Sequence, residues 1–171
     1  LLRISTITAT YKDAEGKQYG VNVLTADGKG TYSQQFVAEN SSVDVTAPAP
    51  TTAYTVFDHW ETNDESAVED INANSTKVNV TDKDVKLTPV YKQVDTPTFE
   101  VKVVTGEGGN GESTGAGYYV EGDKVEISAA IPKEGYMFSH WENKDTYGIG
   151  AGVLLENEYY WNTTFDMVDR Y

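Results

Sequence analysis

The sequence FDHWE at residues 57–61 recurs as FSHWE at residues 138–142, 81 positions later. Both stretches keep a phenylalanine, a histidine, a tryptophan and a glutamate at the same spacing. A pattern that recurs in this way is the signature of a repeat protein, provided that the flanking sequence follows in the same order. The flanks therefore decide whether the chain contains two copies of one unit.

The segments around the motif do follow in the same order in both places. Their separation grows only from 80 to 87 positions along the chain, and a longer loop at residues 146–160 of the second copy accounts for this growth. The matching pairs are 19–23 with 99–103, 43–45 with 125–127, and 77–80 with 164–167. The sequence thus predicts two tandem copies of one module.

A further match involves the N-terminal segment. Residues 7–12 (ITATYK) resemble residues 87–92 (LTPVYK), which we expect to be the last strand of the first copy. We predict that residues 1–12 form a strand that belongs to a preceding repeat or is donated to a neighbouring molecule. Repeat 1 then covers residues 13–92, and repeat 2 covers residues 93–171 and lacks its last strand. The residues expected to make the strand donor are Ile4, Ile7, Ala9 and Tyr11.

Apolar and polar residues alternate in the repeated segments, and this period of two predicts half-buried β-strands. Turn residues such as those at 26–28 and 121–123 separate the strands. We predict a mainly β fold of two tandem small β-rich modules, β-grasp-like or small β-sandwiches, in an elongated arrangement. Residues 65–72 are interpreted as a loop or a single helical turn.

The aromatic residues of the repeated motif are the predicted core of each module, because small modules depend on large side chains to bury enough surface. These residues are Phe57 and Trp60 in repeat 1, and Phe138 and Trp141 in repeat 2. Residues three apart on a regular strand face opposite sides of the sheet. We therefore expect a β-bulge or a strand end within the motif, so that both rings enter the core.

Charge excludes two classes of partner. The chain carries 27 acidic against 13 basic residues, a formal net charge of −14, which repels nucleic acid and anionic lipid surfaces. No apolar stretch is long enough for membrane insertion. The chain has no cysteine, so packing, neighbouring repeats or another crosslink must replace disulfides. The start of the chain, which lacks methionine, is expected to mark a processed protein or a fragment.

Several motifs resemble chemical sites, but their context favours simpler interpretations. Residues 106–111 (GEGGNG) match a dinucleotide fingerprint, yet no helix pattern follows them, so we predict no cofactor. His59 and His140 occur once per repeat, as packing positions do and catalytic bases seldom do. We expect no catalytic residue and no metal site, since two histidines in separate modules cannot readily share an ion.

Weaker alternatives remain at the surface. Acidic turns at 82–84 and 121–123 could hold Ca²⁺, although solvated turns are the simpler interpretation. Aromatic residues at 118–119 and 159–161 could stack on sugar rings, or could build cores and interfaces. Lys86 or Lys124 could form an isopeptide crosslink, without a specific signature.

The ordered motifs resemble the divergent B-repeats of bacterial surface proteins, which are related to the repeat of internalin B. The resemblance rests on EGDKVEI at residues 121–127, GYMFSHW at 135–141 and TTFDM at 163–167, and repeat 1 departs from it with ENS at 39–41. It implies a small β-rich module strung in arrays on large surface proteins, with a spacer or adhesive role. It implies no enzymatic activity and no catalytic residue.

Three functional hypotheses follow. The first is a structural repeat segment, a stalk or adhesin spacer, of an extracellular bacterial surface protein, whose partners are neighbouring repeats. The second is a subunit of an extracellular filament, in which residues 1–12 add a strand to an identical subunit. The third is an adhesin module that binds a host glycan or protein.

Overall fold

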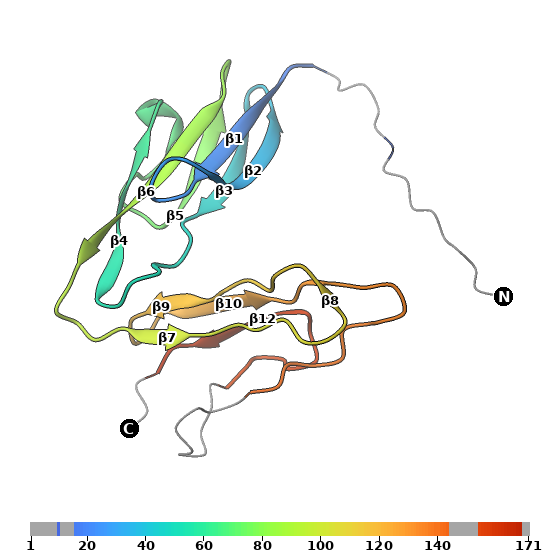
Figure 1. Cartoon of the computed structure of the whole chain (residues 1–171). Coiled ribbons are helices and arrows are strands. Elements are labelled where there is room, and N and C mark those ends of the chain that lie inside the picture. Colours follow the sequence, from blue (N-terminus) through green and yellow to red (C-terminus); the bar gives the residue numbers. More distant parts are fainter. Residues whose placement is uncertain (1–9, 11–15, 144–153, 169–171) are drawn as a thin grey trace.

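The protein is described by a computed structural model that covers residue 10 and residues 16–143 and 154–168. The predicted mainly β fold is confirmed: almost all regular structure is in strands, and the helical content of the described residues is one short 3₁₀ turn, η1 (Glu65–Ala67). Figure 1 shows two β-rich modules joined by one connection between β6 and β7. No helix in these ranges is long and apolar enough to cross a membrane.

The first module contains a four-stranded sheet and a two-stranded sheet. The four-stranded sheet has the order β2-β1-β6-β4, and β3 pairs with β5 in the other sheet. The strands are β1 (Gln18–Leu24), β2 (Thr31–Ala38), β3 (Ser41–Thr46), β4 (Thr55–Thr62), β5 (Ser75–Val80) and β6 (Val85–Gln93). β6 lies between β1 and β4, parallel to the first and antiparallel to the second.

The core of the first module lies where these two sheets contribute their apolar faces. Every second residue of β5 is buried, which is the alternation that a strand with one solvated face requires. The buried cluster includes residues from β1, β5 and β6 together with Trp60 of β4. Phe57 packs against this cluster, with its ring centroid 5.3 Å from that of Trp60.

The irregularity expected inside the aromatic motif is present. The register of β4 against β6 shifts between Phe57 and His59, because Phe57 pairs with Tyr91 while His59 pairs with Val90. The additional residue in β4, Asp58, breaks the strict alternation of side chains. Phe57 and Trp60 can therefore both face the core although they are three residues apart.

In the part of the chain that the structure describes, the second module consists of three two-stranded pairs. β7 pairs with β9, β10 with β12, and β8 with β11, each pair antiparallel. The strands are β7 (Phe99–Val101), β8 (Gly109–Asn110), β9 (Gly117–Tyr119), β10 (Lys124–Ser128), β11 (Ile131–Pro132) and β12 (Asn162–Asp166). Its buried cluster consists of Val125, Ile127, Phe165 and Met167.

Strand register shows that one strand pair is equivalent in the two modules. Val43 pairs with Val78 between β3 and β5, and the corresponding Val125 pairs with Phe165 between β10 and β12. The backbone N–H of Trp60 donates to Ile71 O over 2.8 Å, and that of Trp141 donates to Glu158 O over the same distance. The sequence repeat is thus also a repeat of the fold.

Candidate functional site

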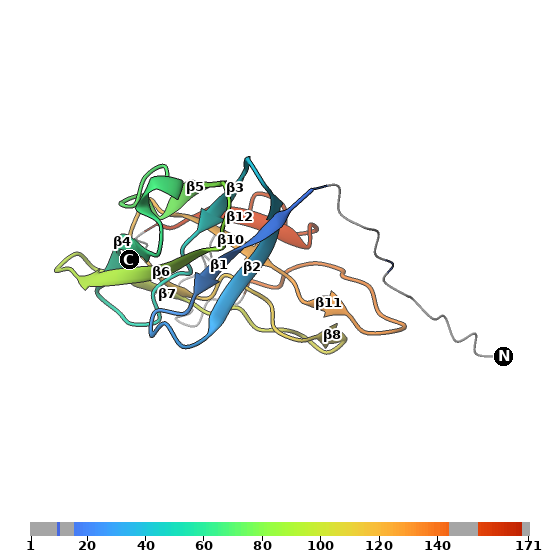
Figure 2. The ribbon, with the colours of Figure 1, turned by 90° about the horizontal axis from the view of Figure 1, so that it is seen from above.

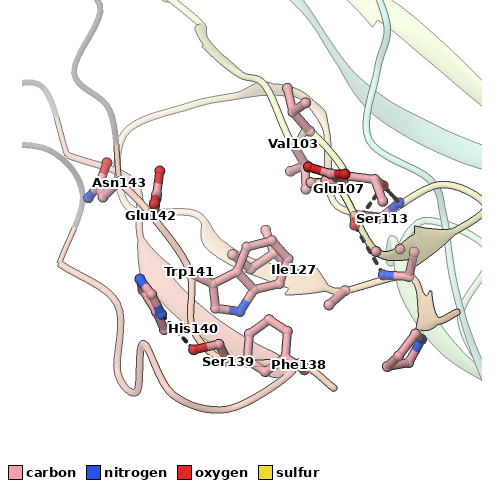
Figure 3. Close-up of a pocket in the computed structure, with 18 of the residues that line it drawn as sticks. Val103, Glu107, Ser113, Ile127, Phe138, Ser139, His140, Trp141, Glu142 and Asn143 are labelled. Atoms are coloured by element: carbon pink, nitrogen blue, oxygen red, sulfur yellow. Dashed lines mark hydrogen bonds between the residues drawn. The ribbon is translucent and has the colours of Figure 1, made fainter. Parts of the chain in front are cut away.

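An open apolar cleft in the second module is the main candidate site. One wall is the chain from Val101 to Gly109, and the facing wall is the segment from Tyr136 to Asn143. Together they enclose a cavity of about 790 Å³. Figure 3 shows Trp141, Phe138 and Ile127 on one side of this space and Val103 with Glu107 on the other.

Buried apolar side chains line the bottom of the cleft. Ile127 of β10 and Phe165 of β12 are only 5% and 2% exposed, and both line the cavity. Val101, Val103 and Leu155 pack around them but remain half-exposed. The cleft is therefore a continuation of the hydrophobic core that opens to solvent.

The tryptophan of the motif is held in the same way in both modules. Trp60 Nε1 donates to Ala73 O and Trp141 Nε1 donates to Tyr160 O, each over 2.9 Å. The Phe138 and Trp141 rings lie 5.6 Å apart at 59°, close to the arrangement of the Phe57 and Trp60 rings. The surroundings differ, because Trp60 is 2% exposed whereas Trp141 is half-exposed beside the cleft.

A polar network lies at one end of the cleft. Ser113 N donates to Thr105 Oγ1 over 2.8 Å, and Ala130 N donates to Ser113 Oγ over 3.0 Å. These bonds tie the Gly-rich loop to the start of β11. The loop itself carries the two-residue strand β8, which pairs with β11 and does not lead into a helix. A pyrophosphate site needs a helix N-terminus at this point, so the geometry does not support one.

The two histidines have different surroundings. His59 Nδ1 lies 2.8 Å from Asp58 Oδ2, and Lys92 Nζ lies 2.8 Å from Asp58 Oδ1. The hydrogen bond from Lys92, followed by that from His59, holds the pKa of Asp58 below its usual value. His140 is exposed, with Nδ1 3.0 Å from Ser139 Oγ. The side-chain partners of the motif histidine therefore differ between the two modules.

One acidic side chain in each of the turns considered for calcium accepts a hydrogen bond from a backbone N–H. Asp84 Oδ1 accepts a bond of 2.7 Å from Gly20 N, and Asp123 Oδ2 accepts one of 2.9 Å from Val120 N. Within the described ranges, no group of three or more histidine and acidic side chains is arranged to hold a metal ion.

The two aromatic clusters considered for sugar stacking, at residues 118–119 and 159–161, differ in exposure. Tyr118 and Tyr119 are half-buried near the first module. Tyr159, Tyr160 and Trp161 are 69%, 59% and 55% exposed just before β12. Only the second group presents several ring faces to solvent.

The strand-donor residues Ile4, Ile7, Ala9 and Tyr11 lie outside the described residues. Thr10, the one described residue in that segment, is exposed.

Sequence reasoning missed the contact between the modules. Tyr118 N donates to Pro50 O over 2.9 Å, and Tyr54 N donates to Thr98 Oγ1 over 2.8 Å. The APAP sequence at residues 47–50 was the available signal, because proline favours an extended segment with few backbone donors.

Comparison with known proteins agrees with the internal repeat. A family model described as the divergent InlB B-repeat domain matches twice, at residues 19–95 and 99–168. No curated protein and no solved structure matches the chain. The family is generally a repeat module without catalytic function, and it suggests a repeat segment of a surface protein. The two matches cover most of the chain and coincide with the two modules, so the chain belongs to the divergent InlB B-repeat domain family.

Proposed function

We propose that this chain is a spacer segment of an extracellular bacterial surface protein, in which the two modules form one stiff unit that separates an adhesive region from the cell. The observation that carries the proposal is the direct hydrogen-bonded contact between the modules. Flexibly linked domains do not need such a contact, whereas a spacer that must hold its length does.

The contact joins the modules at two places besides the chain connection. The segment at residues 47–50 of the first module lies against β9, where Pro50 O accepts a bond from Tyr118 N. Tyr54, at the start of β4, bonds to Thr98 just before β7. Figure 1 shows the first module above the second, and the two overlap when viewed from above (Figure 2). Two hydrogen bonds at separate places oppose rotation of one module relative to the other better than a single bond does.

A glycine allows this close approach. A Cβ atom at Gly117 would lie 2.5 Å from Ala49 Cβ and 3.1 Å from Pro50 O. The first distance is shorter than side chains tolerate, so only glycine lets β9 approach the 47–50 segment this closely. The contact between the two modules thus depends on Gly117 in the second module and on Ala49 and Pro50 in the first.

Surface display tests the spacer role. One, two or three copies of the chain would be placed between a membrane anchor and a fluorescent tip on a cell, and the height of the tip above the membrane would be measured. A stiff spacer raises the tip by equal steps. Gly/Ser linkers of matched length are the control, and their height should grow only as about the square root of length. Growth like that of the control would refute the proposal.

Glycan binding is a second candidate, favoured by the exposed rings of Tyr159, Tyr160 and Trp161. Rings of this kind can stack on sugars. A glycan array would test it, with Trp161→Ala expected to remove any signal and Tyr136→Ala, an exposed residue elsewhere, expected to keep it. An array without a signal above background would rule out glycan binding and leave the spacer role as the remaining proposal.

A further inference from the structure

The strand β6 shows what completes a module of this family. It lies between β1 and β4, with Val21 opposite Val85 on one side and Trp60 opposite Pro89 on the other. Val85 and Leu87 are 1% and 0% exposed. The central strand of the larger sheet is therefore also a main contributor to the core of the first module.

The corresponding place in the second module is the apolar cleft. β7 corresponds to β1, and in the described residues it pairs only with β9. The segment at residues 137–143 corresponds to β4 but is not in a strand. The 790 Å³ cavity lies between the last residue of β7, Val101, with the chain that follows it, and the segment at residues 136–143. The cleft is where a strand equivalent to β6 would lie.

Side-chain exposure marks the same difference. Val21 and Val23, on the strand beside β6, are each 1% exposed, whereas the equivalent Val101 and Val103 are half-exposed at the cleft. The strand β7 ends at Val101, while β1 continues past Val23 to Leu24. Among residues 16–143 and 154–168, β7 has no strand on its other side. This accounts for both effects, because a strand without a partner on one side loses both ladder bonds and cover there.

We propose that this cleft binds residues 5–12 of a second copy of the chain as a β-strand, parallel to β7 and antiparallel to residues 138–142. The proposal goes beyond the spacer role, which stands without it. It makes each molecule both donor and acceptor, so the contact is head to tail and generates a filament.

The occupant is identified by its sequence. Residues 7–12 (ITATYK) match residues 87–92 (LTPVYK) of β6. In the register of the first module, Ile7 takes the place of the buried Leu87, Ala9 that of Pro89 and Tyr11 that of Tyr91. One position differs between residues 5–12 and β6, since Ser5 corresponds to the buried Val85.

Charge complements the apolar match. Residues 1–12 contain Arg3 and Lys12 and no acidic residue, in a chain whose net charge is −14. The cleft is lined by Glu107 and Glu142 as well as by one lysine, Lys102. A basic strand thus approaches an acidic molecule, which favours association between copies that would otherwise repel each other.

Chain length favours a second copy over the same molecule. Residues 13–17 join Lys12 to β1 and span at most about 20 Å. β1 begins at the end of the first module that faces away from the second module and runs towards it (Figure 1). Its seven residues alone cover about 23 Å. The connection is therefore too short to return the segment to the cleft of its own chain.

Disulfide trapping tests both the register and the partner. The chain has no cysteine, so two can be introduced without interference. Thr8→Cys and Glu142→Cys correspond to Thr88 and Glu61, which are opposite each other in the first module. With oxidised glutathione, the full chain carrying both cysteines should give a ladder of covalent oligomers on a non-reducing gel. The control pair, Thr6→Cys with Glu142→Cys, is two residues out of register and should give little.

Two outcomes of the trapping experiment would overturn the proposal. Equal crosslinking by the matched and the shifted pair would mean random collision. A covalent monomer closed on itself would mean that the segment fills its own cleft.

A donor-side variant keeps the test valid if a cleft variant fails to fold. Ile7→Asp places a charge on the face that would be buried, and Thr6→Asp places the same charge on the face that would be exposed. In sedimentation velocity, the unmodified chain and Thr6→Asp should associate with rising concentration, and Ile7→Asp should stay monomeric. Association of Ile7→Asp equal to that of Thr6→Asp, or no association of the unmodified chain, would refute strand donation.

Discussion

A single residue, the tryptophan of the repeated motif, shows how one local arrangement serves two different environments. Trp60 and Trp141 make the same two hydrogen bonds and contact the same phenylalanine of the motif. Only Trp60 is fully covered, and β6 is the strand that pairs with its own strand β4 in the first module. The local geometry is thus independent of the neighbouring strand, whereas the burial depends on it.

This difference predicts unequal costs of truncation. Trp60→Ala should lower the free energy of unfolding of the first module by about 3–5 kcal/mol. Trp141→Ala should cost the second module less, since the ring is already half-exposed. Urea denaturation of the monomeric chain, followed by circular dichroism, would measure both. Equal losses would contradict the assignment of an open cleft.

Two tyrosine hydroxyls, those of Tyr91 and Tyr119, should lose their proton at a higher pH than tyrosines of the unfolded chain. Burial, and then the neighbouring Tyr32, raises the pKa of Tyr91 to about 12, and the same causes in that order raise the pKa of Tyr119 to about 12. Unfolded tyrosines lose their proton near pH 10. Between about pH 10 and 12 the unfolded state therefore binds fewer protons, and stability that is fully present below pH 10 is lost as the pH rises.

The ultraviolet absorbance of tyrosinate would follow this titration. Tyr91→Phe should reduce the late phase near pH 12, and Tyr160→Phe, a change at an exposed position, should leave it intact. A late phase that is absent from the unmodified chain would contradict the burial of these rings.

At the scale of elements, the start of β6 is fixed by a side chain that imitates a neighbouring strand. Asn63 Oδ1 accepts a bond of 2.7 Å from Lys86 N, and Asn63 Nδ2 donates one of 3.0 Å to Asp84 O. β4 ends at Thr62, so the asparagine continues the pairing beyond its last residue. Both bonds bind the backbone of the strand that completes the core.

Asn63→Ala should therefore lower the free energy of unfolding of the first module by about 1–3 kcal/mol, since each lost bond is worth about 0.5–1.5 kcal/mol. Asn79→Ala is the matched control, because Asn79 is exposed on β5. Urea denaturation would compare the two. A loss no greater than that of the control would mean that water replaces the side chain without cost.

The sequence predicted the elements well where alternation was strong and poorly where pairing depends on distant segments. The strands β5, β6 and β10, the bulge at Phe57 and the limited helix near residue 65 agree with prediction. Val103 lies outside β7 although it continues the alternation of Val101. Periodicity reports which face is apolar, but a ladder also needs a partner strand, which the local pattern cannot supply.

At the scale of the whole molecule, comparison of the two copies does not predict the contact between the modules, and the APAP sequence at residues 47–50 is its only local signal in the first module. The contact depends on Gly117 in one module and on Ala49 and Pro50 in the other, and none of these positions belongs to the repeated motif. The repeat predicts what the modules share. What joins them lies in the residues that differ, which is why sequence comparison of the copies could not find it.

Gly117→Val should separate the modules, because the new side chain would meet Ala49. The φ of +154° at Gly117 adds backbone strain within β9, so the control must share that strain. Fluorescence energy transfer between dyes on the two modules should change from a narrow to a broad distribution of efficiencies. Gly111→Val is the control, since Gly111 also has a positive φ, +93°, but a Cβ there meets nothing within 4 Å. An unchanged distribution in Gly117→Val would show that the connecting chain alone orients the modules.

The parallel pairing of β1 with β6 has a mechanical consequence. These are the first and last strands of the first module, and they pair from Val21 with Val85 to Val23 with Leu87. Tension applied through the two ends of the module pulls these strands past one another, so their ladder is loaded in shear and its bonds must break together. Forced unfolding is governed by the rate of crossing that barrier, and a module tethered in flowing liquid would yield slowly.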